Sequence, residues 1–222
     1  MPSLLATEPL ATILETLFQA DENPSPESQA EINAFVGPGL ADLMASKTEY
    51  HRLYSGLKSS TLAVSRNTAH LLYALTRGCK PRAIIEFGTS FGVSTLCMAA
   101  ALRENGSGRL ITTEFEPSKA AKARQNLEAA GLGDLVEIRQ GDALTTLADN
   151  LPPAVDLLLL DGAKGLYPDI LKLVEKSLTP GALVVADDAQ KSPGFIDFLR
   201  AKGGAYVSVP AVDGVEVATK IG

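Results

Sequence analysis

The sequence contains no tryptophan and little cysteine. Its two cysteines, Cys79 and Cys97, are too few for a disulfide scaffold. Because Cys97 lies in the apolar stretch 96–101, we interpret it as a buried free thiol. Since none of the 222 residues is Trp, any aromatic wall of a binding pocket must come from Phe or Tyr.

Excess positive charge and long apolar runs are also missing. The 20 Lys and Arg residues stand against 26 Asp and Glu, which gives a net charge of −6 and no general attraction to nucleic acid or an anionic membrane. No apolar run is long enough to span a bilayer, and residues 1–4 lack the basic start of a secretion signal. We therefore predict a cytoplasmic protein without a membrane or nucleic-acid partner.

Helical and strand patterns divide the chain into two parts of one domain. Residues 1–76 carry apolar side chains at helical spacing, with breaks at 21–26 and 37–39. From Ala83 onward, short apolar runs alternate with helical segments. Strands are expected at 83–87, 109–113, 136–140, 155–160, 182–186, 205–209 and 215–221. Helices are expected between them at about 92–103, 117–130, 167–178 and 193–202.

Strand–helix alternation is typical of a parallel sheet with helices on both faces. The last two runs flank Asp213-Gly214, which favours a hairpin and makes one strand antiparallel. We predict an α/β fold, with a Rossmann-like, doubly wound and mostly parallel sheet of seven strands, an antiparallel C-terminal hairpin strand and N-terminal helices. Residues 77–222 form its core, and residues 1–76 pack on this core as a lid, a dimer contact or both.

A glycine-containing turn follows the first predicted strand. Residues 83–94, AIIEFGTSFGVS, pass from an apolar run through Gly88 and Gly92 into a helical segment. Nucleotide-binding α/β sheets usually begin with such a strand, turn and helix. The spacing fits neither the Gly-x-Gly-x-x-Gly fingerprint of dinucleotide sites nor a P-loop. The turn therefore indicates a ligand approached closely by backbone, without naming it.

Acidic residues stand at or just after the ends of the predicted strands. They are Glu86, Glu114, Asp142, Asp161, Asp187 and Asp188. Because the ligand crevice of an open α/β sheet lies outside the carboxyl ends of its strands, these groups would gather at one edge. Any single one is best interpreted as a solvated turn residue or a helix cap. The whole series, beside a glycine turn, favours a binding site.

Each acid is placed for a different task. Glu114 can accept hydrogen bonds from the two hydroxyls of a ribose, and Asp142 can receive an exocyclic amine of a base. The oxygens of Asp161, Asp187 and Asp188 suit a hard cation such as Mg²⁺. No cluster of basic residues stands ready for a pyrophosphate, so the pattern fits an adenosine-containing cofactor without phosphates.

These motifs resemble the class I S-adenosylmethionine-dependent methyltransferases, and within them the cation-dependent O-methyltransferases of catechol and caffeoyl-coenzyme A type. The resemblance covers about residues 58–222. It rests on 86–94 (EFGTSFGVS), Glu114 with Pro117, 141–143 (GDA), 161–167 (DGAKGLY), 186–188 (ADD) and 213–215 (DGV). The Asp-x-x-Lys-x-x-Tyr pattern of residues 161–167 is the most specific of these.

The resemblance implies a role for each matching residue. It implies that S-adenosylmethionine is bound by Glu86, Gly88, Thr89, Ser94, Glu114, Asp142 and Asp161. It implies that Asp161, Asp187 and Asp188 hold a divalent cation, with Mg²⁺ expected, and that Lys164 is a general base whose pKa the cation lowers. The expected reaction is methyl transfer to a hydroxyl of a small, catechol-like or other vicinal-oxygen acceptor, in a homodimer.

The sequence departs from this family's pattern in two places. Asp188 stands where the family usually has Asn, and Gly162-Ala163 replaces a bulkier or acidic pair. Two alternatives therefore stay open, namely a methyltransferase of the same fold that acts without metal on a natural product or RNA, and a cofactor-binding protein without catalysis. Tyr167 is expected to pack in the core. A reach of Tyr50, His51, Arg52 and Tyr54 to the acceptor is a weaker alternative to helix-surface positions.

Overall fold

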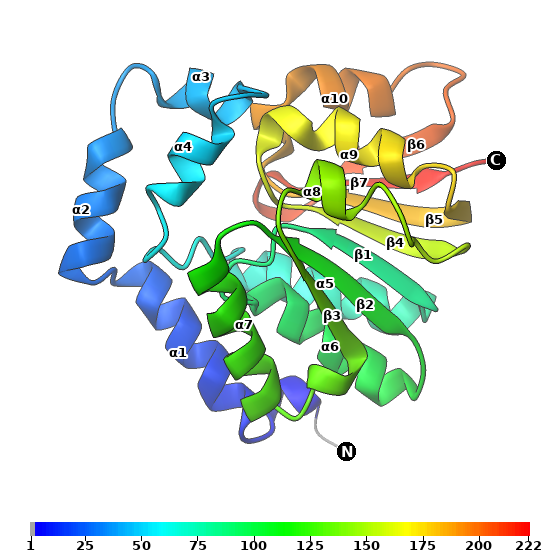
Figure 1. Cartoon of the computed structure of the whole chain (residues 1–222). Helices are drawn as coiled ribbons and strands as arrows, with labels where there is room; N and C mark the ends of the chain where they lie inside the picture. The colour runs from blue at the N-terminus through cyan, green and yellow to red at the C-terminus, as the bar shows by residue number, and fades with distance from the viewer. Residues whose placement is uncertain (1–2) are drawn as a thin grey trace.

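The computed structural model describes residues 3–222. Their centre is a seven-stranded sheet in the order β3-β2-β1-β4-β5-β7-β6 (Figure 1). The strands are β1 (Ala83–Phe87), β2 (Arg109–Glu114), β3 (Val136–Gln140), β4 (Val155–Leu160), β5 (Leu178–Ala186), β6 (Tyr206–Pro210) and β7 (Glu216–Lys220). The α-helices are α1 (Leu10–Glu22), α2 (Pro26–Phe35), α3 (Leu40–Ala45), α4 (Tyr50–Ser55), α5 (Arg66–Cys79), α6 (Val93–Asn105), α7 (Pro117–Ala129), α8 (Ala143–Thr146), α9 (Tyr167–Val174) and α10 (Pro193–Leu199).

The pairing of the strands confirms the predicted topology. Strands β3, β2, β1, β4 and β5 run parallel to their neighbours, and β7 is antiparallel to both β5 and β6. The strand order reverses between β1 and β4, because the chain winds first to one side of β1 and then to the other. Such a switch point opens a crevice beyond the carboxyl ends of the two strands.

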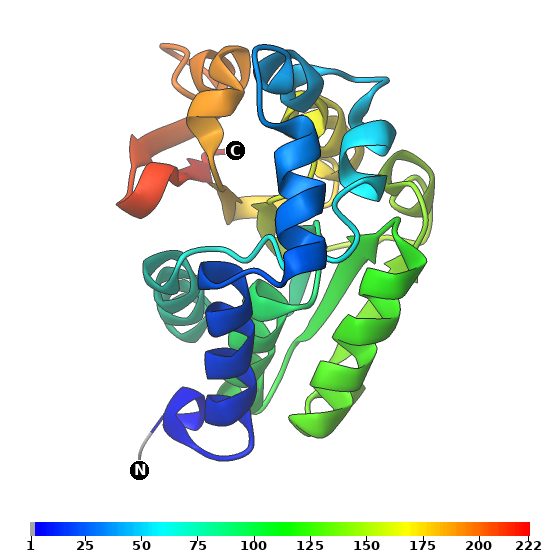
Figure 2. The same cartoon turned by 90° about the vertical axis from the view of Figure 1, so that its left-hand side faces the viewer.

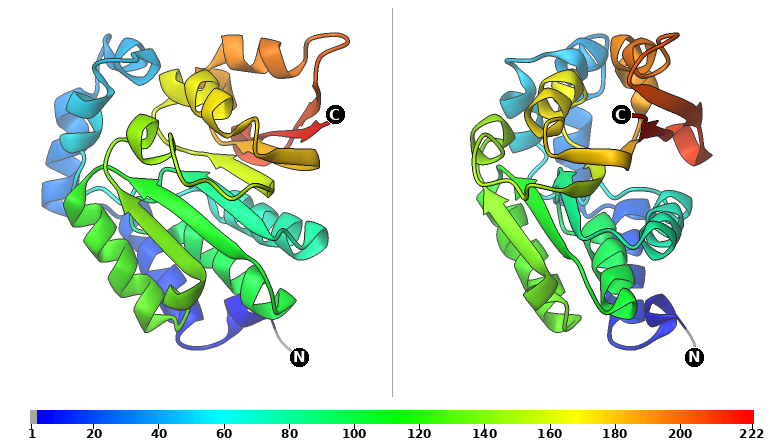
Figure 3. Two further views of the ribbon diagram at one scale, coloured as in Figure 1. Left: turned by 45° about the vertical axis from the view of Figure 1, so that its right-hand side comes forward. Right: turned by 90° about the vertical axis from the view of Figure 1, so that its right-hand side faces the viewer.

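Helices cover both faces of the sheet. Helices α5, α6 and α7 lie on one face, and α8, α9 and α10 lie on the other (Figures 1 and 3). Strand β1 is buried at each of its five residues, and β4 is buried except at the half-buried Asp156. Central parallel strands covered on both faces read as continuous apolar runs, which is why these two segments were predictable from sequence.

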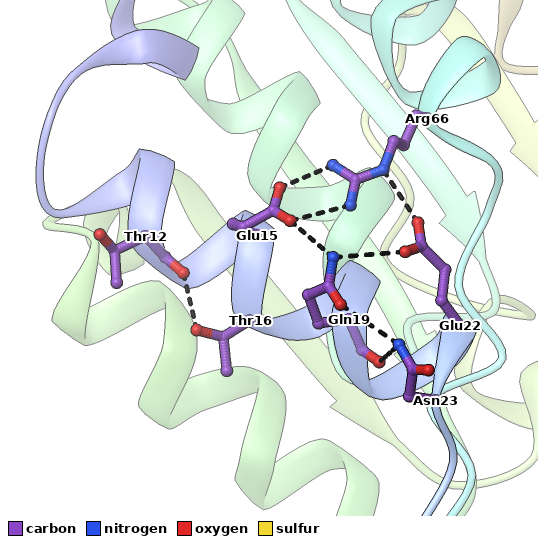
Figure 4. Close-up of polar contacts among 7 residues, drawn as sticks. All are labelled: Thr12, Glu15, Thr16, Gln19, Glu22, Asn23 and Arg66. Carbon is purple, nitrogen blue, oxygen red and sulfur yellow. Dashed lines mark hydrogen bonds and ion pairs between the residues drawn. The ribbon is translucent and has the colours of Figure 1, made fainter.

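The N-terminal helices pack against the core in two different places. Helix α1 buries Leu10, Leu14 and Leu17 against the face of α6. Arg66, the first residue of α5, pairs with Glu15 and Glu22 of α1 and links the start of α5 to that helix (Figure 4). Helices α2, α3 and α4 instead stand beyond the carboxyl edge of the sheet (Figures 1 and 2).

Ser65 joins this N-terminal part to the C-terminal hairpin. Its hydroxyl accepts the backbone N–H of Thr68 as the N-cap of α5, and it donates to the carboxylate of Asp213 at 2.6 Å. Asp213 lies in the five-residue connection between β6 and β7, as predicted for the hairpin. No helix within residues 3–222 is long and apolar enough to cross a membrane.

The boundary between α9 and β5 differs from the prediction. The helix ends at Val174 rather than near residue 178, and β5 begins at Leu178 rather than at 182. Leu178 pairs with Val155, after which the register of the β4–β5 ladder shifts. Pro180 and Gly181 therefore mark an irregularity inside a strand instead of the end of a helix. The short helices α4 and α8 were not predicted, because one turn or two give too little periodicity.

Candidate active site

A cavity of about 360 Å³ opens at the carboxyl edge of the sheet. Its walls come from the ends of β1, β2, β4 and β5 and from the N-terminal segments around α3, α4 and residues 61–64. It is lined by nine of the predicted site residues, namely Gly88, Thr89, Ser94, Glu114, Asp142, Asp161, Lys164, Asp187 and Asp188. The structure thus brings together side chains that lie up to 100 positions apart in the sequence.

Gly88 lets the turn after β1 pass close to the end of β4. Its φ is +103°, and a Cβ at this position would lie 2.7 Å from the carbonyl oxygen of Asp161. The hydroxyl of the neighbouring Thr89 donates to the carbonyl of Thr113 at 3.0 Å, so the turn is also fixed to β2. Both the backbone angle and the available space therefore require glycine at residue 88.

Replacing Gly88 with alanine is expected to destabilise the fold by about 2–4 kcal/mol, because left-handed strain and overlap with backbone act together. Gly106→Ala is the matched control, since Gly106 also has a positive φ, +73°, but nothing lies within 4 Å of its Cβ position. That variant should lose only about 1 kcal/mol. Denaturant unfolding of both variants measures the difference, and equal losses would contradict the close approach at Gly88.

Glu86 is not among the residues that line the cavity, and its contact with the cofactor stays a prediction. Its fully buried carboxylate accepts hydrogen bonds from the hydroxyls of Ser94 and Thr95, in the first turn of α6. Burial raises the pKa of Glu86 to about 7, although these hydroxyls oppose the shift. Every residue of β1 is buried, so the Glu86 side chain lies in the protein interior. There it is hydrogen-bonded to the start of α6, the helix that follows the glycine turn.

Backbone N–H groups hold both carboxylate oxygens of Glu114, whose contact with a ribose stays a prediction. One carboxylate oxygen accepts the N–H of Ser90 at 2.8 Å, and the other accepts the N–H of Glu116 at 2.9 Å. These bonds orient a side chain that is 8% exposed, and burial raises its pKa. Each carboxylate oxygen keeps a further acceptor site, so two ligand hydroxyls can be bound.

Asp142 lies under two rings of α4. One of its oxygens accepts the N–H of Leu144 and caps α8, and the other accepts the hydroxyl of Tyr50 at 2.9 Å. His51 stacks on Tyr50 with ring centroids 4.0 Å apart, and its Nε2 is 3.6 Å from the same carboxylate. Burial and the carboxylate raise the pKa of Tyr50 to about 12.

Of the α4 residues proposed to reach the acceptor, Tyr54 lies by the opposite group of acids. Burial raises the pKa of Tyr54, while the nearby charge of Lys164 lowers it and that of Asp161 raises it. Tyr50 and His51 lie at the Asp142 end of the cavity instead, and Arg52 is exposed with its guanidinium 4.0 Å from Glu49. Sequence periodicity did not show which of these four side chains reaches which part of the cavity.

Lys164 lies between two buried carboxylates. Its Nζ is 3.0 Å from Asp161 and 3.7 Å from Asp187, and its side chain is 5% exposed. Tyr167 packs under it, with the ammonium 5.4 Å from the ring centroid, and donates its hydroxyl to the carbonyl of Asp187 at 2.8 Å. The expectation that Tyr167 packs in the core is confirmed, since it is fully buried.

The charges in this group do not cancel. Burial lowers the pKa of Lys164, but Tyr167 and the two carboxylates outweigh burial, so that its pKa is raised well above the usual value. Lys164 is therefore an ammonium in this arrangement, and the predicted lowering of its pKa depends on a cation beside it. Burial raises the pKa of Asp161, and burial together with Asp161 raises that of Asp187 to about 7. When both carboxyl groups are ionised, their two negative charges face the single positive charge of Lys164. A further positive charge at this place would therefore be stabilised.

Asp188 lines the same cavity but forms its hydrogen bonds outside this pair. Its backbone is left-handed, with φ +50°, and its carboxylate accepts hydrogen bonds from Lys191 at 2.5 Å and Gln190 at 3.0 Å. Across residues 3–222, no three His, Cys, Asp or Glu side chains converge to hold a metal ion. Asp161 and Asp187 fit a hard cation by burial and donor type, whereas the role of Asp188 as a third ligand remains a prediction.

The second departure from the family pattern has a packing reason. A Cβ at Gly162 would lie 2.5 Å from the ring of Phe87, so this ring fills the place of a side chain. Sequence reasoning missed two lysines that line the cavity, Lys119 and Lys191. Lys191 follows Asp188 by three positions, a spacing that signals a local ion pair, whereas nothing in the sequence sets Lys119 apart from a surface lysine.

Comparisons with known proteins find similar methyltransferases. A family model described as a methyltransferase domain matches residues 85–189. Catechol O-methyltransferase of Niastella koreensis is 36% identical over 139 residues, which are 61% of this chain and 62% of that protein. Catechol O-methyltransferase of Sus scrofa is 32% identical over 147 residues, 64% of this chain and 78% of that protein.

A solved structure gives the same result for the fold. The O-methyltransferase TomG from Streptomyces achromogenes, in complex with S-adenosylmethionine, is 27% identical with a TM-score of 0.64. The similarity covers 88% of this chain and 96% of TomG. Together with the pig enzyme, this shows that the chain belongs to the class I S-adenosylmethionine-dependent O-methyltransferases of catechol and caffeoyl-coenzyme A type.

Proposed function

We propose that the protein transfers the methyl group of S-adenosylmethionine to a hydroxyl oxygen of a small acceptor with two neighbouring oxygens, such as a catechol. The observation that carries this proposal is that one cavity holds Glu114 at one end and the Asp161–Lys164–Asp187 group at the other. The names of the relatives support a catechol-like acceptor, although the chain spans only 62% of the first of them.

The cofactor would lie along the carboxyl ends of β1 and β2. Gly88 and Thr89 would contact its methionine part, with Ser94 at the start of α6, since all three line the cavity. Glu114 would accept the ribose hydroxyls with the two oxygens that backbone N–H groups already orient. Asp142 would receive the adenine amine, next to the rings of Tyr50 and His51.

The acceptor would lie on the other side of the transferred methyl group. Its walls would be Met44, Tyr54, Leu62 and Leu166, all of which line the cavity. A phenol has a pKa near 10, so little of it is ionised at neutral pH. The buried positive charge of Lys164 favours the phenolate, and a fixed in-line approach to the sulfonium supplies much of the remaining rate. We retain Lys164 as the group that takes the proton when its own pKa is lowered.

A divalent cation fits beside Asp161 and Asp187. When bound, it supplies Lewis-acid stabilisation of the phenolate and orients two neighbouring oxygens. The protein's own contribution is to bury the two carboxylates at 14% and 15% side-chain exposure and to hold Lys164 between them. A homodimer, a cytoplasmic location and the roles of residues 1–76 as lid or dimer contact are retained as part of the proposal.

Methyl transfer from labelled S-adenosylmethionine to catechol, in the presence of Mg²⁺, tests the proposal. We expect a mono-O-methylated product and an equal amount of S-adenosylhomocysteine. Substituted catechols, a caffeoyl thioester and a simple monophenol complete the acceptor panel, and the monophenol should react much more slowly because it has one oxygen. Tight binding of S-adenosylhomocysteine without product from any acceptor would instead favour the non-catalytic alternative.

A further inference from the structure

Lys119 of α7 is buried beside the cavity with few partners. It is 3% exposed, and its Nζ lies 5.7 Å from the ring centroid of Phe91. Within residues 3–222, the ammonium donates one hydrogen bond, to the hydroxyl of Ser90 at 3.2 Å. An ammonium has three N–H donors, so two remain for a ligand in the cavity that Lys119 lines.

Ser90 connects this ammonium to Glu114. The backbone N–H of Ser90 donates to one oxygen of Glu114 at 2.8 Å, and its hydroxyl accepts the Lys119 hydrogen bond. The same hydroxyl donates to the carbonyl of Thr61 at 2.5 Å, in the segment that covers the cavity. Lys119 and Glu114 therefore reach the same part of the cavity from neighbouring positions on α7 and β2.

Four carboxylates from different elements surround the Lys119 charge. Glu114 ends β2, Glu116 precedes α7, Asp21 lies in α1 and Glu31 lies in α2. Burial outweighs their attraction and lowers the pKa of Lys119 to about 8. In return, the Lys119 charge opposes the effect of burial on Glu114 and helps to keep that carboxyl group ionised.

We propose that Lys119 is a further cofactor-binding residue, whose ammonium donates a hydrogen bond to a ribose hydroxyl oxygen while Glu114 accepts from the ribose hydroxyls. An ammonium and a carboxylate at one diol use both the oxygen lone pairs and the hydroxyl protons of the sugar. The inference rests on the proposed function, because it takes the ligand to be S-adenosylmethionine. It adds a positive residue to a site whose predicted residues near the ribose were acidic.

Calorimetric binding of S-adenosylhomocysteine to the full chain tests the assignment. Lys119→Met should weaken binding about 10- to 100-fold, because a charge-assisted hydrogen bond is lost. Lys122→Met, an exposed lysine on the same helix, should bind like the wild type. Thermal unfolding of Lys119→Met is measured beside its binding, and Lys119→Arg, which keeps the positive charge beside Glu114, is the second variant that separates lost binding from lost folding.

Deoxy analogues of the ligand locate the contact. The penalty of Lys119→Met should fall to about threefold or less for the 2′-deoxy or the 3′-deoxy analogue of S-adenosylhomocysteine, whichever lacks the hydroxyl that Lys119 contacts. An unchanged penalty for both analogues would overturn the proposal. Failure of the wild type to bind S-adenosylhomocysteine at all would be a failure of the proposed function instead.

The pH dependence of binding gives a second, independent measurement. Because the charged form of Lys119 is present below its pKa of about 8, wild-type affinity should fall as the pH rises from 7 to 9.5. Lys119→Met should lack this step, and Lys119→Arg should remain charged and show no step either. Comparing variants with one ligand cancels the titration of the ligand's own amine. A wild-type affinity that is constant across this range would contradict the assignment.

Discussion

Replacing Lys164 with alanine is expected to lower kcat for methyl transfer by about 100- to 10,000-fold. The physical reason is that its ammonium lies 3.0 Å from Asp161 and 3.7 Å from Asp187, at 5% side-chain exposure. A group buried in this way is not replaced by a cation from solvent when the side chain is removed. The loss should appear in kcat rather than in cofactor affinity, because Lys164 lies at the acceptor end of the cavity. Steady-state rates with catechol, together with calorimetric binding of S-adenosylhomocysteine, measure both quantities.

Lys164→Arg decides between the two ways in which this residue can act. A guanidinium keeps the positive charge but does not release a proton at any accessible pH. If Lys164 takes the acceptor's proton, the arginine variant should be nearly as slow as the alanine variant, and we expect this result. An arginine variant with about one-tenth of wild-type activity or more would contradict proton transfer and leave Lys164 as a fixed charge that stabilises the phenolate.

Removing divalent cations with a chelator is expected to lower methyl transfer about 100-fold or more, and excess Mg²⁺ should restore it. The reason is the surplus of negative charge where Asp161 and Asp187 face one ammonium, which raises the pKa of Asp187 to about 7. Asp187→Asn removes one of the two carboxylates and should need a much higher Mg²⁺ concentration for half-maximal activity. Rates across a Mg²⁺ titration, for wild type and variant, measure the effect.

Two controls make the chelator experiment specific. Binding of S-adenosylhomocysteine should change by less than about threefold in chelator, because the proposed cofactor contacts of Glu114 and the glycine turn involve no metal. Asp188→Asn introduces the residue that the family usually has and also frees Lys191 from its ion pair. If Asp188 is a ligand, this variant should change the Mg²⁺ requirement. Full activity of the wild type in chelator would contradict the metal role and favour the metal-independent alternative.

The sheet and its edge were predictable from the sequence because their signals are local. Apolar runs such as 83–87 and 155–160 correspond to strands buried on both faces, and the chain order of strands and helices gives a doubly wound topology. The acids were predictable as a group, because parallel strands end at one edge. The burial of Glu86 was not predictable, since a carboxylate at a strand end can equally bind the hydroxyls of the next helix, as Glu86 binds those of Ser94 and Thr95.

The cover of the cavity was not predictable in the same way. Tyr50 and Tyr54 lie four positions apart on α4, yet one contacts Asp142 and the other lies by Lys164. Their directions depend on how a six-residue helix packs on the sheet, and a helix of that length has too little periodicity to show a buried face. Lys119 illustrates the same limit, because α7 has an ordinary pattern of surface lysines and only the fold shows which of them is buried.

The hydrogen bond between Ser65 and Asp213 has a consequence for biosynthesis. These residues are 148 positions apart, so the start of α5 gains this contact only after the ribosome has made the connection between β6 and β7. Lys47 and Asp169 form a second such contact across 122 positions. Contacts this distant in sequence form late, because the intervening chain must first be ordered. The segments that cover the cavity therefore leave the ribosome before the C-terminal segments that they contact, and they are among the last to reach their final places.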